Sequence, residues 1–159
     1  MTPEGATLPR VELTHVELSV ATGTLVPRFE QDLDRLLHDA FGWVGATTVD
    51  DVPDAGPSTS RTYVVSSHVK LVLREQPIAM TAGTEDHLAF LVGSTELDEL
   101  VERTLALAST DDRLELRHVR DGRASAVAGG PFVFRTFFVR FLLPVWFQFE
   151  SYESRPDGG

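Results

Sequence analysis

A long internal repeat restricts the fold of this chain more than any other feature. Two segments, Thr14–Val20 (THVELSV) and Asp86–Val92 (DHLAFLV), match each other, and each carries a histidine at its second position. A stretch with apolar residues at helical spacing follows each segment. The chain between His15 and His87 is long enough for a strand, a helix and three further strands. The sequence therefore predicts two copies of a βαβββ unit.

These units divide the chain into two modules. We expect a flexible arm at 1–10, a first module at 11–75, a linker at 76–86, a second module at 87–153 and a flexible tail at 154–159. The predicted fold class is α+β, in which two βαβββ repeats form curved, partly open, barrel-like mixed sheets with the helices on the outside.

The individual elements follow from the spacing of apolar residues and from glycine and proline. Helices are expected at 27–41 and 94–109. Loops rich in glycine, proline or serine are expected at 50–60 and 121–131. Strands are expected at 11–20, 43–49, 61–65, 69–74, 87–92, 114–119, 132–141 and 146–153.

Composition excludes several classes of protein. The chain has 24 acidic against 14 basic residues, and a formal net charge of −10 argues against a nucleic-acid-binding groove. It has no cysteine, so disulfides, thiolate metal sites and cysteine nucleophiles are excluded. The pattern also predicts no membrane-spanning segment and no signal peptide. We therefore expect a cytoplasmic protein that binds neither nucleic acid nor membrane.

Four motifs in this repeat resemble the vicinal oxygen chelate superfamily. Thr14–Val20 is similar to the first strand of that family, and Asp86–Phe90 (DHLAF) is similar to its fifth. Pro144–Glu150 (PVWFQFE) resembles the segment that leads into the last strand, and Ala40–Trp43 (AFGW) resembles the usual end of the first helix. The superfamily includes glyoxalases, fosfomycin-resistance proteins, bleomycin-resistance proteins and extradiol dioxygenases.

The resemblance implies that His15, His87 and Glu150 are metal ligands inside a cup of strands. Two imidazoles and one carboxylate on polar strand faces would make a facial triad with open positions for substrate. Such a triad holds a divalent transition metal, namely iron, manganese, nickel or zinc, which can polarise substrate oxygens. Each residue also has a structural interpretation, as a packed histidine or a solvent-facing glutamate.

The sequence departs from the pattern of the superfamily in two places. Leu143, Val145 and Trp146 replace the Asp, Asp and Gly that usually precede the last strand, which leaves the register of Glu150 open. The fourth strand has no carboxylate before Glu75, whereas glyoxalases often carry a further ligand there. Three protein ligands therefore fit better than four, as in the fosfomycin-resistance and dioxygenase branches.

Four further residues are candidates for contact with a substrate. Glu17 shares a strand face with the first histidine and is the nearest candidate general base; the alternative is a rim carboxylate without a role in proton transfer. Gln148 and Tyr152 share the face of the glutamate ligand, and Tyr152 could donate a hydrogen bond. Arg135 is one of two arginines at odd separation in 132–141, so at most one of the two can hold an anion in the cup.

Two functions from different classes follow, both with a small molecule as partner. The first is a metal-dependent, glyoxalase- or dioxygenase-like enzyme, a lyase, isomerase or dioxygenase with a vicinal-oxygen substrate. The second is a non-catalytic protein that binds a drug or metabolite without a metal, where the acidic charge and aromatic strands would suit a planar cation. A third reading is a family member with a closed cup that serves only to associate. We expect a homodimer, because exposed apolar strands are otherwise a liability.

Overall fold

The computed structural model describes residues 12–52, 56–129 and 132–154. The predicted arm lies outside these residues, and so does the predicted tail apart from Ser154. In chain order the elements are β1 (His15–Ala21), α1 (Pro27–Asp34), the π-helix η1 (Arg35–Ala40), β2 (Val44–Val52), β3 (Gly56–Val64), β4 (Lys70–Gln76), β5 (His87–Leu91), α2 (Ser94–Ala108), β6 (Glu115–Arg117), β7 (Val119–Arg120), β8 (Arg123–Gly129), β9 (Phe132–Arg140) and β10 (Trp146–Ser154).

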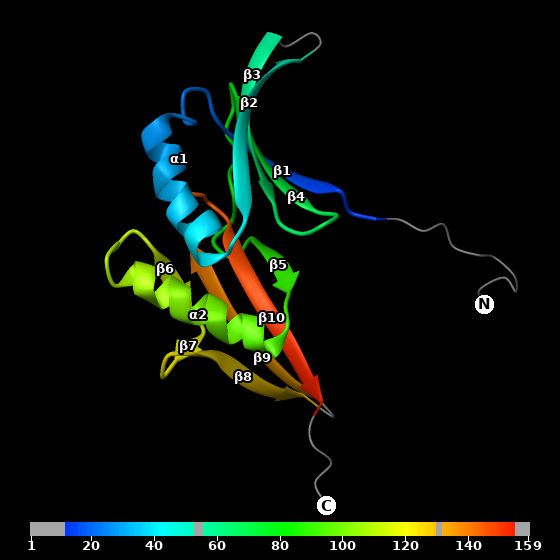
Figure 1. Cartoon of the computed structure of the whole chain (residues 1–159), viewed down its shortest axis with the longest axis vertical. Helices are drawn as coiled ribbons and strands as arrows, with labels where there is room; N and C mark the ends of the chain where they lie inside the picture. The colour runs from blue at the N-terminus through cyan, green and yellow to red at the C-terminus, as the bar shows by residue number, and fades with distance from the viewer. Residues whose placement is uncertain (1–11, 53–55, 130–131, 155–159) are drawn as a thin grey trace, which may run out of the picture.

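Two sheets of mixed strand direction carry the fold (Figure 1). Sheet A has the strand order β1-β4-β3-β2, and sheet B has the order β5-β10-β9-β8-β7 with β6 beside β9. In each sheet the first strand of the module runs parallel to the last, β1 with β4 and β5 with β10, and the neighbouring pairs are antiparallel. The predicted α+β class with two βαβββ units is therefore confirmed. The short strands β6 and β7 are additions to the second unit.

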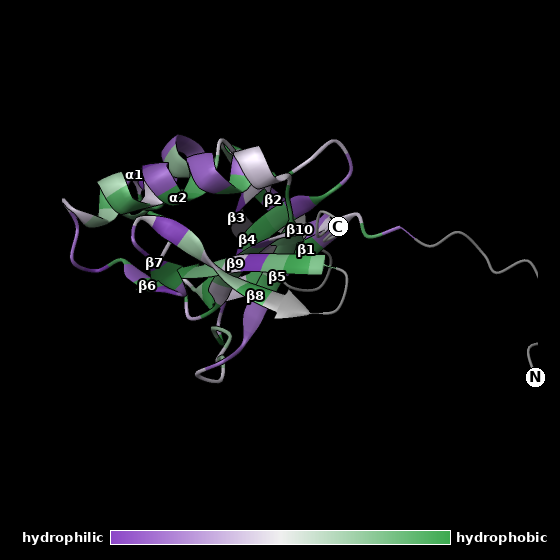
Figure 2. Cartoon of the chain, turned by 90° about the horizontal axis from the view of Figure 1, so that it is seen from below, coloured by the Kyte–Doolittle hydropathy of each residue, from purple (hydrophilic) through white to green (hydrophobic). Residues whose placement is uncertain are grey.

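The helices of both units lie on the same side of the strands (Figure 2). The first helix begins at Pro27, whose fixed φ suits the first helical turn. The chain leaves η1 through Gly42 at a φ of +77°, a conformation that favours glycine. Among the described residues, no helix combines the length and the apolar character that a membrane crossing needs. The side of each sheet away from the helices, which we call its open face, has no helix over it in the part of the chain that the structure describes.

Two of the predicted loops are wrong in part. The loop expected at 121–131 contains strand β8, and the strand expected at 114–119 is two short strands that are separated at His118, where φ is +59°. The small residues of β8 pair with the aromatic strand β9, and this pairing outweighs the weak strand preference of alanine and glycine. Strands β2 and β3 both extend into the loop expected at 50–60, where they form an antiparallel pair, and 53–55 lie outside the described residues.

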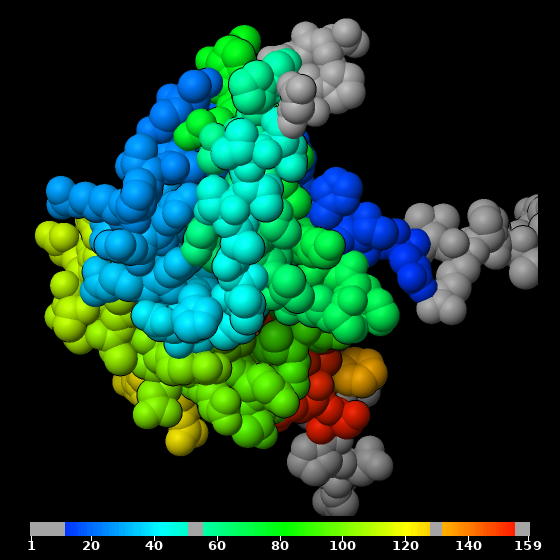
Figure 3. Space-filling model, turned by 45° about the horizontal axis from the view of Figure 1, so that its top comes forward, coloured from blue at the N-terminus to red at the C-terminus, as the bar shows by residue number. Residues whose placement is uncertain are grey.

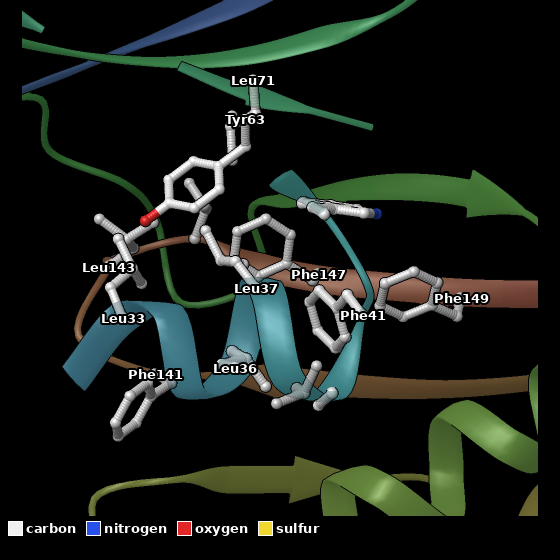
Figure 4. Packing of buried hydrophobic residues seen from close by; sticks show 14 of the residues in the cluster. Leu33, Leu36, Leu37, Phe41, Tyr63, Leu71, Phe141, Leu143, Phe147 and Phe149 are labelled. Carbon is white, nitrogen blue, oxygen red and sulfur yellow. The ribbon is translucent and has the colours of Figure 1, made fainter. Parts of the chain in front are cut away.

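One hydrophobic core lies between the helices and the strands of both modules. Phe41, just after η1, packs edge-on against Phe147 and Phe149 of β10, with ring centroids 5.9 and 4.6 Å apart (Figure 4). Trp43 from the first module also contacts Phe90 of β5, with centroids 5.2 Å apart. In the space-filling view the blue and cyan segments of the first module lie directly against the second module (Figure 3). The two modules therefore share one core.

An ionic cluster on the helix side also joins the modules. Arg113, which follows α2, donates hydrogen bonds of 2.9 and 2.7 Å to the carboxylate of Asp111 and one of 2.9 Å to Asp32 of α1. Arg35, the first residue of η1, donates a hydrogen bond of 2.8 Å to Asp111. The hydrogen bonds from Arg113 hold the pKa values of Asp32 and Asp111 below their usual range.

We expect this cluster to make the protein less stable in acid. The pKa values of Asp32 and Asp111 are lower in the folded protein than in the unfolded chain. Their contribution to the free energy of unfolding is therefore complete above about pH 5. It is lost as the pH falls, first through their pKa values in the unfolded chain and then through those in the folded protein. The melting temperature should therefore fall from about pH 5 to about pH 2.5. An Arg113→Gln variant should show a shallower fall over the same range, and equal slopes in the two proteins would contradict this account.

Candidate functional site

The open face of sheet A is a regular grid of mainly polar side chains. Residues of one parity in β1, β4, β3 and β2 share this face, and the strand register places them in rows across the sheet. The first row is His15, Lys70, Val64 and Val44; the second is Glu17, Val72, Thr62 and Ala46; the third is Ser19, Arg74, Ser60 and Thr48.

A cavity of about 520 Å³ lies over this grid, within the range of small-molecule sites. Four hydroxyl side chains and two histidines contribute to its lining. The hydroxyl of Thr62 has no hydrogen-bond partner among the described residues, whereas Thr48 and Ser60 share a hydrogen bond of 3.1 Å. The lining residues are Thr14, His15, Glu17, Thr48, Asp50, Ser60, Thr62, His68, Lys70, Val72 and Arg74.

The charged groups of this cavity are unevenly paired. Arg74 donates a hydrogen bond of 3.1 Å from Nε to Glu17, so the candidate general base is held in an ion pair. His15 Nδ1 lies 3.1 Å from the hydroxyl of Thr14. Lys70, which stands beside His15 in the first row, has no acidic partner among the described residues.

The open face of sheet B is more aromatic. Its rows contain His87 beside Trp146, then Ala89, Gln148, Phe138 and Arg117, then Leu91, Glu150, Thr136 and Ser125, and finally Tyr152, Phe134 and Val127. The imidazole of His87 packs edge-on against Phe138, with ring centroids 5.7 Å apart. Its Nδ1 lies 2.9 Å from the backbone oxygen of Glu85. Both predicted histidines are thus on open faces, but on different sheets.

Glu150 lies among uncharged polar groups. Gln148, which is buried, donates a hydrogen bond of 3.0 Å from Nε2 to Glu150 and another of 3.2 Å to Thr136. The hydroxyl of Tyr152 lies 3.4 Å from the other carboxylate oxygen of Glu150. Desolvation and, after it, the neighbouring carboxylate raise the pKa of Tyr152. The three residues that the sequence places on one face therefore do form one hydrogen-bonded group.

Arg135 lies on the opposite side of its strand. Its guanidinium pairs with Asp98 of α2 and, at 3.5 Å, with Glu153. The hydrogen bond that Arg135 donates to Asp98 is the main reason why the pKa of Arg135 is raised. Because it faces the helix, Arg135 is not part of either open face.

Sequence reasoning missed a cluster around Trp146, which is buried although it lies on the open-face side of β10. The guanidinium carbons of Arg117 and Arg140 lie 4.2 and 4.6 Å from the centroid of its ring. Each arginine is also bound to a glutamate, Arg117 to Glu85 and Arg140 to Glu115. The arrangement fills the position where the superfamily pattern has glycine, and no spacing signal in the sequence links these strands.

The three predicted metal ligands do not meet within the described chain. His15 is on sheet A, whereas His87 and Glu150 are on sheet B. His87 pairs with Trp146, and Glu150 is four residues further along β10. The Cα atoms of His87 and Glu150 are therefore about 14 Å apart. Bonds of about 2 Å to one ion require donors much closer together than that spacing provides. Among the described residues, no group of three or more His, Asp or Glu side chains could hold a metal ion.

Comparison with known proteins places the fold. No protein-family model matches the sequence, and no curated protein matches it significantly. Fosfomycin resistance protein FosX from Listeria monocytogenes has a TM-score of 0.58 at 17% identity, over 90% of this chain and 94% of that one. The oxidase ChaP-H2 has a TM-score of 0.56 at 14% identity, over 93% and 98%. A glyoxylase/bleomycin resistance protein/dioxygenase domain from Frankia sp. EAN1pec has a TM-score of 0.53 at 20% identity, over 92% and 100%.

These neighbours cover nearly the whole length of both chains, although few residues are identical. The agreement therefore concerns the path of the backbone through both modules. The fold that the sequence motifs predicted is confirmed: this chain has the fold of the vicinal oxygen chelate superfamily.

Proposed function

We propose that this chain binds a small, oxygen-rich molecule on the open face of sheet A, and that it needs no resident metal ion to do so. The observation that carries this proposal is the polar cavity of about 520 Å³ over that face. Hydroxyl groups, imidazoles and an ammonium group line it, and such groups exchange hydrogen bonds with alcohol, carbonyl or acid oxygens. This is the non-catalytic alternative from the sequence, with an oxygenated ligand in place of a planar cation.

The surroundings of the two histidines do not fit a resident metal. The side chain beside His15 is the ammonium of Lys70, which repels a cation, and the diagonal position holds Val72. Beside His87 is Trp146, and the diagonal position holds the amide of Gln148. A second copy of the chain could bring His15 near sheet B, but it would leave the spacing within sheet B unchanged.

A metal-dependent, glyoxalase- or dioxygenase-like enzyme is the second candidate function. One observation favours it: both modules place a histidine at the same point of the first strand, on the open face. Under this hypothesis His15, His87 and Glu150 are the metal ligands. Glu17 lies on the open face that carries His15, and Tyr152 lies on the open face that carries Glu150. Metal analysis of protein purified without a His tag separates the two candidate functions. We expect far less than one transition-metal ion per chain, whereas a stoichiometric ion that is lost in His87→Ala would favour the enzyme.

A homodimer remains part of this proposal. The open face of sheet B carries Leu91, Val127, Phe132 and Tyr152, whose side chains are between 49% and 70% exposed. Apolar side chains clustered on a surface are typical of contacts with another protein. Association through this face would leave the cavity of sheet A available for a ligand.

The binding proposal predicts where a ligand will perturb the protein. We expect small carboxylates, phosphonates, diols or sugars at millimolar concentration to shift backbone amide signals in β1, β3 and β4, before and after treatment with a chelator. A Thr62→Phe variant should abolish these shifts, because the ring fills the centre of the cavity. The matched variant Thr95→Phe, at an exposed position of α2, should retain them. If Thr62→Phe still binds as the native protein does, the ligand lies elsewhere and the proposal fails.

A further inference from the structure

We infer that the molecule bound on sheet A carries an oxyanion, a carboxylate or a phosphate group, and that Lys70 receives it. The inference rests on the proposed function, since it concerns the same cavity. It adds the chemical class of the ligand and the residue that selects it.

Lys70 provides a positive charge that no other side chain of the described chain neutralises. It is the only lysine of a protein with 24 acidic residues. It lies exposed in the first row of the open face, and no acidic side chain among the described residues pairs with it. An ammonium group that points into a cavity and lacks a counter-ion is available for an anionic ligand.

The acidic groups of the same cavity are either occupied or far from Lys70. Glu17 is diagonal to Lys70 in the grid, but its carboxylate accepts the hydrogen bond from Arg74. Asp50 lies near the C-terminal end of β2, whereas the first row of the grid contains Val44 at the start of that strand. Its carboxylate accepts a hydrogen bond of 3.5 Å from Thr48. Lys70 is therefore a cation of this cavity that has no carboxylate partner among the described residues, although the chain as a whole is strongly acidic.

Two further donors stand around Lys70. His15 is its direct neighbour on β1, at a strand spacing of about 5 Å. Thr62 is diagonal to it on β3, at a Cα distance of about 7 Å, and the hydroxyl of Thr62 has no protein partner among the described residues. An ammonium, a hydroxyl and an imidazole can together saturate the oxygens of one carboxylate or phosphate.

The net charge of the whole protein favours a cationic ligand, so the inference of an anionic ligand is a specific one. From composition alone the acidic chain would suit a cationic ligand, because opposite charges attract at long range. The pairing in the cavity reverses that expectation at short range. A ligand with an oxyanion should bind at this face, and a planar cation such as benzamidine should not.

Titration with four aromatic probes tests the inference. Benzoate and phenylphosphonate carry the two kinds of oxyanion, benzyl alcohol is neutral and benzamidine is cationic. We expect one or both anions to shift amide signals of β1, β3 and β4 in the native protein. Lys70→Gln should weaken this binding about tenfold or more, which corresponds to losing one charged hydrogen bond. Lys70→Arg should retain most of it, because the charge is kept.

Arg120→Gln is the matched control. It removes one positive charge from an exposed strand end, and Arg120 has no ion pair among the described residues. Affinity for the anions should therefore be unchanged in this variant. Equal weakening in Lys70→Gln and Arg120→Gln would show that only the overall charge matters, and would overturn the inference.

The remaining outcomes separate this inference from the function on which it rests. If benzyl alcohol or benzamidine shifts signals on sheet A and neither anion does, the binding face stands and the oxyanion is refuted. If both anions bind and Lys70→Gln binds them as well as the native protein, Lys70 is not the receiving group. If no probe shifts any signal of this face and the broader set of oxygenated compounds also fails, both proposals are refuted.

Discussion

Replacing Arg61 with methionine is expected to lower the free energy of unfolding by about 3 kcal/mol, because it removes the charged hydrogen-bond partner that the half-buried carboxylate of Asp34 and the buried phenol of Tyr63 share. The guanidinium of Arg61 lies between sheet A and α1. It donates hydrogen bonds of 2.7 Å to Tyr63, 2.8 Å to Thr47 and 2.5 Å to Asp34. Tyr63 in turn donates one of 2.7 Å to Asp34, and its hydroxyl points toward α1 (Figure 4).

The protonation of Arg61 and Tyr63 does not change near neutral pH. Burial alone would lower the pKa of Arg61, but its hydrogen bonds to Asp34 and Tyr63 outweigh burial and raise it. Burial, and after it the carboxylate of Asp34, raises the pKa of Tyr63 far above its usual range. Both groups therefore stay protonated, and the cost of Arg61→Met should be the same from about pH 6 to about pH 9.

An exposed ion pair of the same chain gives the matched comparison. Arg103 lies 3.8 Å from Glu99 one helical turn away, and both side chains are exposed, at 44% and 62%. Arg103→Met should cost less than about 0.5 kcal/mol, as is usual for such pairs. Urea unfolding of the two variants measures the difference. A cost below about 1 kcal/mol for Arg61→Met would mean that water replaces its hydrogen bonds and that the network is not structural.

The sequence was sufficient for the fold, because the fold follows from local patterns that occur twice. The histidine strand and the amphipathic helix appear in both halves at equivalent places. Gly42 also marks the end of the first helix in sequence and in structure. What local pattern misjudged was β8, whose alanines and glycine have weak strand preference until β9 pairs with them.

The site was less predictable, because it depends on register between strands that are distant in sequence. The parity of Gln148, Glu150 and Tyr152 could be read from spacing, and the structure does place them together. The register between Glu150 and His87 could not be predicted, since no local sequence signal fixes how β10 pairs with β5. Lys70 was visible as the only lysine, but its position beside His15 exists only in the folded sheet.

Replacing Phe149 with alanine is expected to lower the free energy of unfolding by about 4 kcal/mol, the largest effect that we expect for one residue. Its ring lies 4.6 Å from that of Phe41, 5.4 Å from that of Phe90 and 5.5 Å from that of Phe137, between centroids. Alanine would leave a cavity where the two modules meet. Tyr152→Ala, in the same strand but 56% exposed, should cost less than about 1 kcal/mol.

The place of Phe149 in a shared core further predicts that both modules unfold together. The chain has two tryptophans, Trp43 in the first module and Trp146 in the second. Trp43→Phe and Trp146→Phe therefore give two proteins whose fluorescence reports on one module each. In each protein, calorimetry and fluorescence should give one and the same transition, and adding Phe149→Ala should lower it equally in both. A shared core predicts one transition, because unfolding one module alone would expose Phe41 and Phe149 to water. Separate transitions would contradict this prediction and would mean that each module is stable by itself.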